Sequence, residues 1–295
     1  MTISVAILTW NRVSKLLEAL ESVKAQTRSA DEIVVVDSAS RDNTCTIINR
    51  IYPDIKLIRL HRNLGCPMGR NLSLANCSSD VIYSLDDDAR LHPKCLEIVE
   101  QVFTDHPKVG IVASKVLMEM NPSSVQVAQQ LSKSPRRTVR FLGGACAIRR
   151  EVLEKAGYYP NDFWRQSEEA DLALRAIDVG FELWYAPAAI MLHPPGIADS
   201  STALDHTTWN TLRSITRLCP ARYVPLILAH QTIKYIVLGV CNHKLKRVGL
   251  GIGRWVMSLP RQLRQRHPVR VESMREYLRL RREYFAYLKA HGNAL

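Results

Sequence analysis

The first hundred residues alternate short apolar runs with segments of helical periodicity, and this order restricts the chain to few folds. The apolar runs are Ile3–Thr9, Glu32–Asp37, Ile55–Arg59 and Asp80–Leu85. The helical segments are Ser14–Ala25, Asp42–Ile51, Gly69–Asn76 and Pro93–Phe103. Unbroken apolar runs are typical of strands buried on both faces of a parallel sheet. The order therefore predicts an α/β fold, with an open, mostly parallel, twisted sheet flanked by helices.

Polar residues stand at or just after the ends of these runs. They are Thr9, Asp37, Arg62 and the acidic triplet Asp86–Asp88. Open α/β sheets bind their ligands beyond the carboxyl ends of the strands. We therefore expect these residues to lie together in a ligand-binding site.

The acidic triplet directly follows the apolar sequence VIYSL. Side chains alternate along a strand, so Asp86 and Asp88 are expected on one side, with Asp87 between them. Like charges this close raise the free energy unless a cation is present. A divalent metal with diphosphate oxygens fits, because Mg²⁺ takes one or two carboxylates together with substrate phosphates. The alternative is a solvated acidic turn or a helix N-cap, and the buried strand before the triplet favours the metal.

Four further residues have both a structural and a functional interpretation. Asp37 either binds a nucleotide base or ribose, or caps the following turn. Glu168 and Glu169 either lie favourably at a helix N-terminus or supply a general base beside a sugar. His193 is either a structural residue or a third metal ligand. The residues alone leave these alternatives open.

The second part of the chain is organised less clearly. Strands are predicted over Val109–Val116, Phe141–Arg149 and Glu182–Ala186, the last ending in a turn at Pro187, and a loop over Asn121–Arg137. We expect a catalytic domain over residues 1–204, with a nucleotide-binding half over about 1–100 and an acceptor half over about 101–204. Residues 205–295 would form a basic helical segment.

The positive charge of the chain is confined to this C-terminal segment. The net charge is +12, and residues 205–295 hold 17 Lys and Arg against 4 Asp and Glu. Such a tail predicts an anionic partner, either a membrane surface or a nucleic acid. Apolar side chains at helical spacing from Trp255 to Leu263, interleaved with arginines, favour the anionic membrane surface, and no nucleic-acid partner is expected. Packing of the tail as a helical subdomain against the catalytic body is the alternative.

An apolar stretch over Tyr223–Cys241 contains His230 and Lys234. A lysine at the centre of a bilayer costs about 2.5–3.5 kcal/mol, so we expect a buried or interfacial helix rather than a membrane span. The seven cysteines show no zinc-like spacing, and the N-terminus lacks the basic segment of a secretion signal. A cytoplasmic protein, peripheral at the inner face of the cytoplasmic membrane, is expected.

Several signatures of other enzyme classes are missing from the sequence. It holds no P-loop lysine motif, no G-x-G-x-x-G after the first strand and no serine nucleophile elbow. These absences count against P-loop nucleotidases, Rossmann dehydrogenases and α/β-hydrolases.

Seven motifs in order carry a resemblance to a known family. They are TWNR, EIVVVDSASRDNT, RNLGCPMGRN, YSLDDDA, LGGACAIRRE, SEEADLALR and LHPPG. Between Met1 and about Gly196 the chain resembles the inverting glycosyltransferases of family 2, which have the GT-A fold. Within that family it is most similar to bacterial enzymes of the rhamnosyltransferase type, which build surface polysaccharides.

The resemblance implies a role for each matching residue. It implies Mn²⁺ or Mg²⁺ on Asp88, with Asp86 towards the ribose and His193 as a further metal ligand. Glu169 would be the catalytic base, although the family usually has aspartate there, so the choice between Glu168 and Glu169 stays open. The donor nucleotide would be bound by Thr9, Asn11, Arg12, Asp37 (facing a uracil or thymine base), Arg70, Asn71, Asp86 and Asp87, with Gly143 and Gly144 making room for donor sugar and acceptor.

The resulting expectation is an inverting transfer of a sugar from a nucleotide-diphosphate sugar, with UDP or dTDP favoured, to an acceptor hydroxyl. The acceptor would be a saccharide or a lipid-linked saccharide in the synthesis of a cell-surface polysaccharide or glycoconjugate. A nucleotide-sugar-binding protein without transferase activity and a basic nucleic-acid-binding protein are the alternatives. The sequence leaves the oligomeric state open.

Overall fold

The computed structural model of the protein describes residues 1–118, 134–194 and 203–291. Most of the predicted loop over Asn121–Arg137 lies outside these ranges, as do Pro195 and Gly196 of the closing motif. The last two residues of that predicted loop, Arg136 and Arg137, form a short strand instead.

The centre of the molecule is a nine-stranded sheet with the order β3-β2-β1-β4-β8-β6-β9-β5, in which β7 pairs with β9. Its strands are β1 (Ile3–Thr9), β2 (Glu32–Asp37), β3 (Lys56–Arg59), β4 (Val81–Asp86), β5 (Arg90–Leu91), β6 (Val109–Met118), β7 (Arg136–Arg137), β8 (Ala145–Arg149) and β9 (Glu182–His193). The pairs among β1 to β4 are parallel, as predicted, whereas β8 runs antiparallel to β4 and β6. The parallel register sets Thr9 beside Asp37 and Leu8 beside Asp86, which brings the carboxyl ends together.

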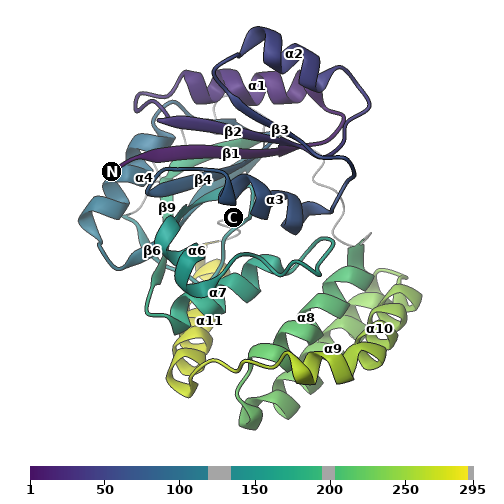
Figure 1. Ribbon diagram of the computed structural model, residues 1–295. Coiled ribbons are helices and arrows are strands. Elements are labelled where there is room, and N and C mark those ends of the chain that lie inside the picture. The colour runs from purple at the N-terminus through teal and green to yellow at the C-terminus, as the bar shows by residue number, and fades with distance from the viewer. Residues whose placement is uncertain (119–133, 195–202, 292–295) are drawn as a thin grey trace.

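Helices cover both faces of this sheet (Figure 1). Apolar side chains of α1, α2 and α4 pack in one core, and those of α3, α6, α7 and α11 pack in the core on the other face. The described helices are α1 (Val13–Lys24), α2 (Thr44–Ile51), α3 (Cys66–Ala75), α4 (Cys95–Asp105), α6 (Arg150–Ala156), α7 (Glu168–Asp178), α8 (Leu204–Leu218), α9 (Val224–Cys241), α10 (Leu245–Arg264) and α11 (Val271–His291).

The predicted turn at Pro187 is wrong, because β9 continues through this residue to His193. Its pairing with β6 jumps from Ala186 to Ile190 between adjacent residues of β6. Pro187 therefore lies in a bulge, where a residue without an N–H group is tolerated within a sheet. The strand resumes after the bulge and carries His193 to the carboxyl edge of the sheet.

Two other predicted boundaries differ from the structure. The strand expected from Phe141 begins only at Ala145, because Gly143 and Gly144 form a turn across which the Ala145 N–H donates to the Leu142 carbonyl. Helix α3 begins at Cys66, three residues before the predicted start, with Pro67 in its first turn. Proline is well placed there, since the first N–H groups of a helix have no partner within the helix.

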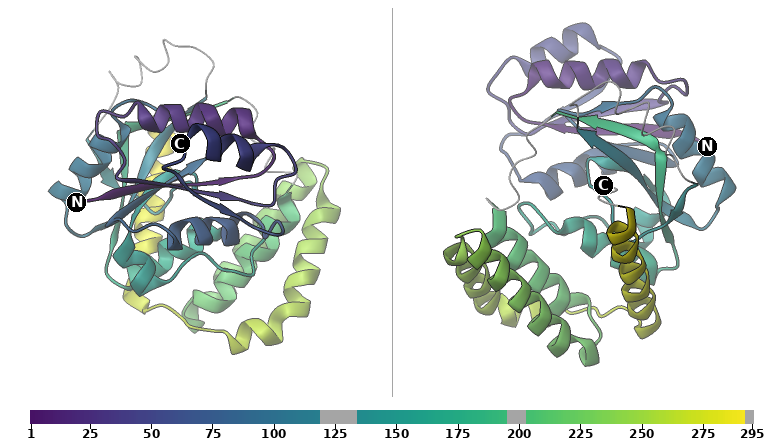
Figure 2. Two further views of the ribbon diagram at one scale, coloured as in Figure 1. Left: turned by 45° about the horizontal axis from the view of Figure 1, so that its top comes forward. Right: turned by 180° about the vertical axis from the view of Figure 1, so that it is seen from behind.

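The C-terminal helices pack on the body of the protein at two places. Helices α8, α9 and α10 form a bundle beside the sheet, and α11 returns beneath it next to α7 (Figures 1 and 2). The Asn210 amide of α8 donates hydrogen bonds to the carbonyls of Arg165 and Gln166, just before α7. Leu280 of α11 packs in the core with Leu172 of α7. The C-terminal segment therefore supports the start of α7.

Helix α9 is not the buried helix that was one of the two predicted alternatives. The helical stretch over Ala221–Cys241 has a mean hydropathy of 1.5, and only 17% of it is buried. Leu226 is 74% exposed and Ile233 is 62% exposed. By length and composition this stretch is the one candidate for crossing a membrane among the described residues. The interfacial alternative stays a prediction.

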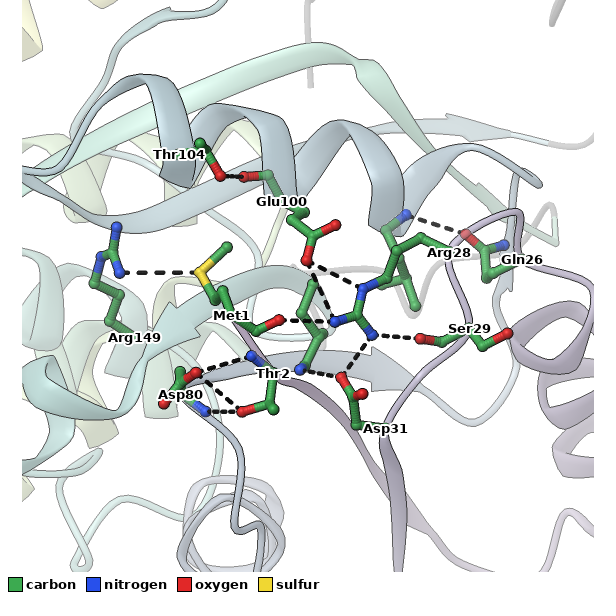
Figure 3. Close-up of polar contacts among 12 residues, drawn as sticks. Met1, Thr2, Gln26, Arg28, Ser29, Asp31, Asp80, Glu100, Thr104 and Arg149 are labelled. Carbon is green, nitrogen blue, oxygen red and sulfur yellow. Dashed lines mark hydrogen bonds and ion pairs between the residues drawn. The ribbon is translucent and has the colours of Figure 1, made fainter.

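A network of polar contacts closes the opposite edge of the sheet, where β1 and β4 begin (Figure 3). Asp80 accepts hydrogen bonds from the backbone N–H and the hydroxyl of Thr2, at 2.8 and 3.0 Å. Arg28 donates to the Met1 carbonyl and forms ion pairs with Asp31 and Glu100. The polar groups at this edge therefore pair with one another, at the end of the sheet opposite the carboxyl ends of β1 and β4.

We expect Arg213→Ala to lower the free energy of unfolding by about 1–3 kcal/mol. Arg213 is only 2% exposed, pairs with Asp162 and lies over the rings of Phe163 and Trp209. Arg261→Ala is the matched control, because Arg261 reaches the same carboxylate at 3.8 Å with a side chain that is 64% exposed. It should change stability by less than about 0.5 kcal/mol, as urea unfolding would measure. Equal losses in both variants would contradict this account.

Candidate active site

A cleft of about 1980 Å³ opens along the carboxyl edge of the sheet. It runs from the ends of β1 and β4, past the start of α7, to side chains of α8, α9 and α11. Pockets for single ligands usually measure about 300–1,000 Å³. The cleft is therefore large enough for two substrates.

The acidic triplet lies at the floor of the cleft, but not along a strand as predicted. Strand β4 ends at Asp86, and Asp87 and Asp88 form the turn that follows. Asp87 points inward, where its carboxylate accepts a hydrogen bond from the Thr9 hydroxyl at 2.8 Å. Burial raises the pKa of Asp87 to about 6. Asp87 and Thr9 thus join the turn after β4 to the end of β1.

Asp86, Asp88 and His193 form a set of donors for a metal ion, with ligand atoms that all lie within 4.8 Å of one another. The Nδ1 atom of His193 is 2.9 Å from the carbonyl oxygen of Pro194, which can only accept. In a neutral ring Nε2 is then an acceptor as well, and it lies 3.3 Å from the Asp88 carboxylate. Two acceptors at this distance require a proton or a metal ion between them, so the residues fit a divalent cation.

Without a metal, a proton takes this position. The hydrogen bond from His193 lowers the pKa of Asp88, and the same bond raises the pKa of His193. Arg12 adds a second positive charge, with Nη1 at 2.5 Å from Asp88 and 3.3 Å from Asp87. The Arg12 side chain is 52% exposed, and it reaches this site from the loop after β1. The carboxylates of the acidic turn are therefore contacted by two basic side chains, His193 and Arg12.

A buried arginine links the acidic turn to the glutamate pair. Arg70 of α3 lies 2.5 Å from Asp86 and 3.6 Å from Glu168. Glu168 is 2% exposed, and its Oε2 atom has no hydrogen-bond partner among the described residues. Burial raises the pKa of Glu168 to about 8, so the carboxyl group is protonated at neutral pH.

Glu169 has different surroundings from its neighbour. It is partly exposed and lines the cleft, and its Oε1 atom accepts a hydrogen bond from the Gly143 N–H at 3.1 Å. This bond fixes one carboxylate oxygen and leaves the other for a ligand. Of the two glutamates, Glu169 is therefore the more accessible to a ligand in the cleft.

Gly143 and Gly144 line the cleft, but the space they leave is taken by the protein's own side chains. A β-carbon on Gly144 would lie 2.0 Å from the carboxyl carbon of Asp86. On Gly143 it would lie 2.8 Å from the Arg70 guanidinium. The two glycines thus allow Asp86 and Arg70 to reach their positions, while room for a donor sugar stays a prediction.

Three predicted binding residues have side chains that do not line the cleft. The Asp37 carboxylate is fully buried and accepts from the Ser40 N–H. Asn71 bonds to the backbone of Tyr159 through both amide atoms. Asn11, at a positive φ of 53°, accepts a hydrogen bond from the Arg41 N–H. Direct contact of these three with a nucleotide remains a prediction from the resemblance.

Several cleft residues had no signal in the sequence analysis. Trp164 is 48% exposed and lines the cleft just before the glutamate pair. Arg140, Lys234 and Arg281 line its far end, from three separate parts of the chain. An exposed aromatic or a lone cation is common in any sequence, so only the fold reveals that these side chains converge.

Comparisons with known proteins agree with this geometry. The sequence profile of the family described as Glycosyl transferase family 2 matches residues 4–157. An uncharacterized glycosyltransferase of Haemophilus influenzae is 27% identical over 183 residues, which cover 59% of this chain and 62% of that protein. The O-antigen chain rhamnosyltransferase RfbN of Salmonella typhimurium is 26% identical over 214 residues, with 65% and 66% covered. The matches thus span less than two thirds of either relative.

Solved structures with the same fold include a complex of S. aureus TarS 1-349 with UDP-GlcNAc. Its TM-score is 0.65 at 16% identity, covering 89% of this chain and 83% of that one. GalNAc-T7 with UDP, GalNAc and Mn²⁺ has a TM-score of 0.61 at 17% identity, covering 75% and 48%. The predicted GT-A architecture is confirmed.

The buried Glu168 carboxyl group predicts a pH dependence of stability. Because its folded pKa is about 8, above the usual value of 4.5, its protonated form stabilises the fold at low pH. That contribution is lost as the pH rises from about 4.5 through about 8. Wild-type protein should therefore lose stability towards pH 9 or so, whereas Glu168→Gln, a neutral mimic, should lose less.

Thermal unfolding of both proteins from about pH 5 to about pH 9 tests this. A relative shift of about 2–4 °C corresponds to about 1 kcal/mol in a chain near this size. Parallel curves for the two proteins would show that Glu168 is ionised in the fold at neutral pH.

Proposed function

Because the chain belongs to glycosyl transferase family 2 and is a glycosyltransferase, we propose that it moves a sugar from a nucleotide-diphosphate sugar to an acceptor hydroxyl with inversion at the anomeric carbon. One observation carries this proposal. A single cleft joins the donor set of Asp86, Asp88 and His193 to the partly exposed carboxylate of Glu169. The first can bind the leaving diphosphate through a metal, and the second can activate the attacking hydroxyl.

Asp86, Asp88 and His193 would hold Mn²⁺ or Mg²⁺. The cation would neutralise the charge that develops on the leaving diphosphate. GalNAc-T7, which has the same fold, was solved with UDP and Mn²⁺, which supports this choice. Arg12 lies beside the same carboxylates and would pair with diphosphate oxygens.

Glu169 would act as the general base. Its carboxylate removes the proton of the acceptor hydroxyl while that oxygen attacks the anomeric carbon, and the bond from this carbon to the diphosphate oxygen breaks on the opposite side. The Gly143 N–H fixes the orientation of the base at 3.1 Å. Glu168 is protonated and buried against Arg70, so its role is to position Arg70 and, through it, Asp86.

For the donor we propose a UDP- or dTDP-sugar. TarS with UDP-GlcNAc supports a uridine nucleotide in this fold. Thr9, at the end of β1, and Asn11, in the loop after it, would shape the nucleotide pocket. The Thr9 hydroxyl donates to Asp87 in the turn after β4, and the Asn11 N–H donates to the Ser40 hydroxyl in the loop after β2. The match to an O-antigen rhamnosyltransferase supports a saccharide or lipid-linked saccharide acceptor and a role in surface polysaccharide synthesis.

Exposed apolar side chains on α9 and α10 support a position at the surface of the cytoplasmic membrane. Ile233, Val237 and Val240 are 62%, 53% and 56% exposed, and Met257 of α10 is 77% exposed. Lysine and arginine side chains accompany Met257 along α10. Side chains of this kind enter the headgroup region of an anionic bilayer. Part of the positive charge of the C-terminal segment is neutralised within the protein, because Asp205 pairs with Arg247 and Arg254. This pairing weakens the nucleic-acid alternative.

Donor turnover tests the reaction. Asp88→Asn and Glu169→Gln should each lower transfer by about 100-fold or more, because each removes a charge used in the transition state. Asp105→Asn, at an exposed position in α4, should transfer at the wild-type rate. Released nucleotide diphosphate would be measured for a panel of UDP-, dTDP- and GDP-sugars, with Mn²⁺ or with EDTA. Near-normal rates in both variants would refute the assignments.

Membrane binding has a separate test. Ile233→Glu with Val237→Glu should reduce co-sedimentation with vesicles of anionic phospholipid by about tenfold, because charged side chains do not enter the bilayer. Ile51→Glu changes an apolar residue of α2 that is 47% exposed, on the body, and should leave binding intact. Donor hydrolysis reports that the variants are folded. Unchanged sedimentation of the double variant would exclude α9 as the membrane contact.

A further inference from the structure

The segment before the glutamate pair has a strained backbone. Residues 164–169 line the cleft between its strand end, at the acidic triplet, and its helical end, at α9 and α11. Within this segment Gln166 and Ser167 have positive φ angles of 72° and 70°. Residues other than glycine disfavour this left-handed region, so two of them in succession persist only where the surrounding structure holds them. Strain of this kind is typical of functional sites.

Helix α7 begins without a cap of its own. A serine before a helix usually has an extended backbone, and its hydroxyl accepts a hydrogen bond from an N–H group of the first turn. Ser167 instead has a φ of 70° and a ψ of 4°, and its hydroxyl makes no such bond to the described start of α7. That hydroxyl lies 3.1 Å from the Thr211 hydroxyl of α8. The position of Glu168 and Glu169 therefore depends on contacts outside their own helix.

Asn210 of α8 supplies two of these contacts. Its side chain is fully buried, and its amide nitrogen donates to the carbonyls of Arg165 and Gln166, each at 2.9 Å. Its Oδ1 atom accepts a hydrogen bond from Arg213 at 3.4 Å, so both ends of the amide are paired. A polar group that loses its partner away from water is costly. The amide therefore keeps both carbonyls, and with them the strained conformation, in place.

We propose that Asn210 is a positioning residue for Glu169. By holding the strained segment, it fixes the direction in which α7 enters the cleft and so the place of the Glu169 carboxylate. The Gly143 N–H then holds one oxygen of this carboxylate at 3.1 Å. Asn210 does not itself line the cleft, so it acts on the reaction only through Glu169. The inference rests on the proposed function, because it concerns the base of that reaction.

Turnover and donor affinity together test this role. The substrate is the nucleotide sugar that wild-type protein hydrolyses in the donor panel. Asn210→Ala should lower its hydrolysis by about tenfold or more, because a displacement of a catalytic group by about 1 Å has effects of this size. The affinity for UDP with Mn²⁺ should equal that of wild type, since Asp86, Asp88 and His193 lie on other elements. Hydrolysis at the wild-type rate refutes the positioning role.

Thr216→Val is the matched control. Thr216 is 3% exposed in the same helix, and its hydroxyl accepts a hydrogen bond from Trp255 of α10 rather than from the segment before α7. This variant should be less stable than wild type, yet hydrolyse the donor at the wild-type rate wherever it is folded. An equal loss of hydrolysis in both variants would show that Asn210 only supports the helical bundle, and would overturn the proposal.

A glycine background tests strain as the link between Asn210 and Glu169. Glycine adopts the left-handed region without the penalty, so Asn210→Ala should lower turnover about threefold less, or better, when Gln166→Gly is already present. The comparison within this cycle removes any effect that the Gln166 side chain itself has on the reaction. Equal losses in the two backgrounds contradict the proposed link.

Amide hydrogen exchange gives a readout that does not need turnover. In Asn210→Ala the amides of residues 165–170 should exchange about tenfold or more faster, while those of β1 and β4 keep their wild-type rates. Faster exchange along the whole chain would show a general loss of stability and refute the local role.

The same experiments separate this inference from the proposed function. Wild-type protein that hydrolyses no nucleotide sugar contradicts the proposed function, whatever hydrogen exchange shows. Normal hydrolysis by wild-type protein that Asn210→Ala leaves unchanged contradicts the positioning role alone.

Discussion

Arg70 holds the candidate site together through an ion pair with Asp86 and a contact with the protonated carboxyl group of Glu168. Its guanidinium is buried between Asp86, the last residue of β4, and Glu168, the first residue of α7. A charge removed from water is costly unless it is paired and hydrogen-bonded, so these elements are held at the separation that Arg70 sets. The adjoining glycines belong to the same arrangement, because a side chain on Gly144 would displace Asp86. One buried cation thus positions both the acidic turn and the glutamate pair.

Much of the first half could be predicted from the sequence, because local patterns there agree with the tertiary structure. The apolar runs predict β1 to β4 within a residue or two. Of the polar residues at their ends, Thr9 and the acidic triplet line the cleft, whereas Asp37 and Arg62 do not. His193 lies beside Asp86 and Asp88, as its interpretation as a metal ligand requires, but the sequence does not predict how it reaches them. The local sequence at Pro187 predicts a turn, and only the pairing of β9 with β6 shows that this residue lies in a bulge within a continuous strand. Tertiary pairing overrides a local signal of this kind.

The glutamate pair and the C-terminal helices show what sequence patterns do not contain. Glu168 and Glu169 are adjacent and chemically alike, and burial alone separates a protonated neighbour of Arg70 from a carboxylate that faces the cleft. The contacts of α8 with the residues before α7 cannot be predicted from the sequence either. Its Asn210 amide donates hydrogen bonds to the carbonyls of Arg165 and Gln166, and Gln166, two residues before Glu168, has a positive φ of 72°. The C-terminal segment, which the sequence analysis described by its charge, therefore also supports the residues just before the glutamate pair.

The exposure of α9 has a consequence for how the two substrates reach the enzyme. The helix lines the cleft with one set of side chains and presents another set, including Ile233 and Val237, to the outside. If that outer set rests in a bilayer, the helical end of the cleft opens at the level of the lipids while the strand end faces water. A hydrocarbon-bearing acceptor would then arrive by lateral diffusion within a surface, and the donor from bulk solution. Turnover would follow the density of acceptor per unit area of membrane, and dilution of the cytoplasm would change only the supply of donor.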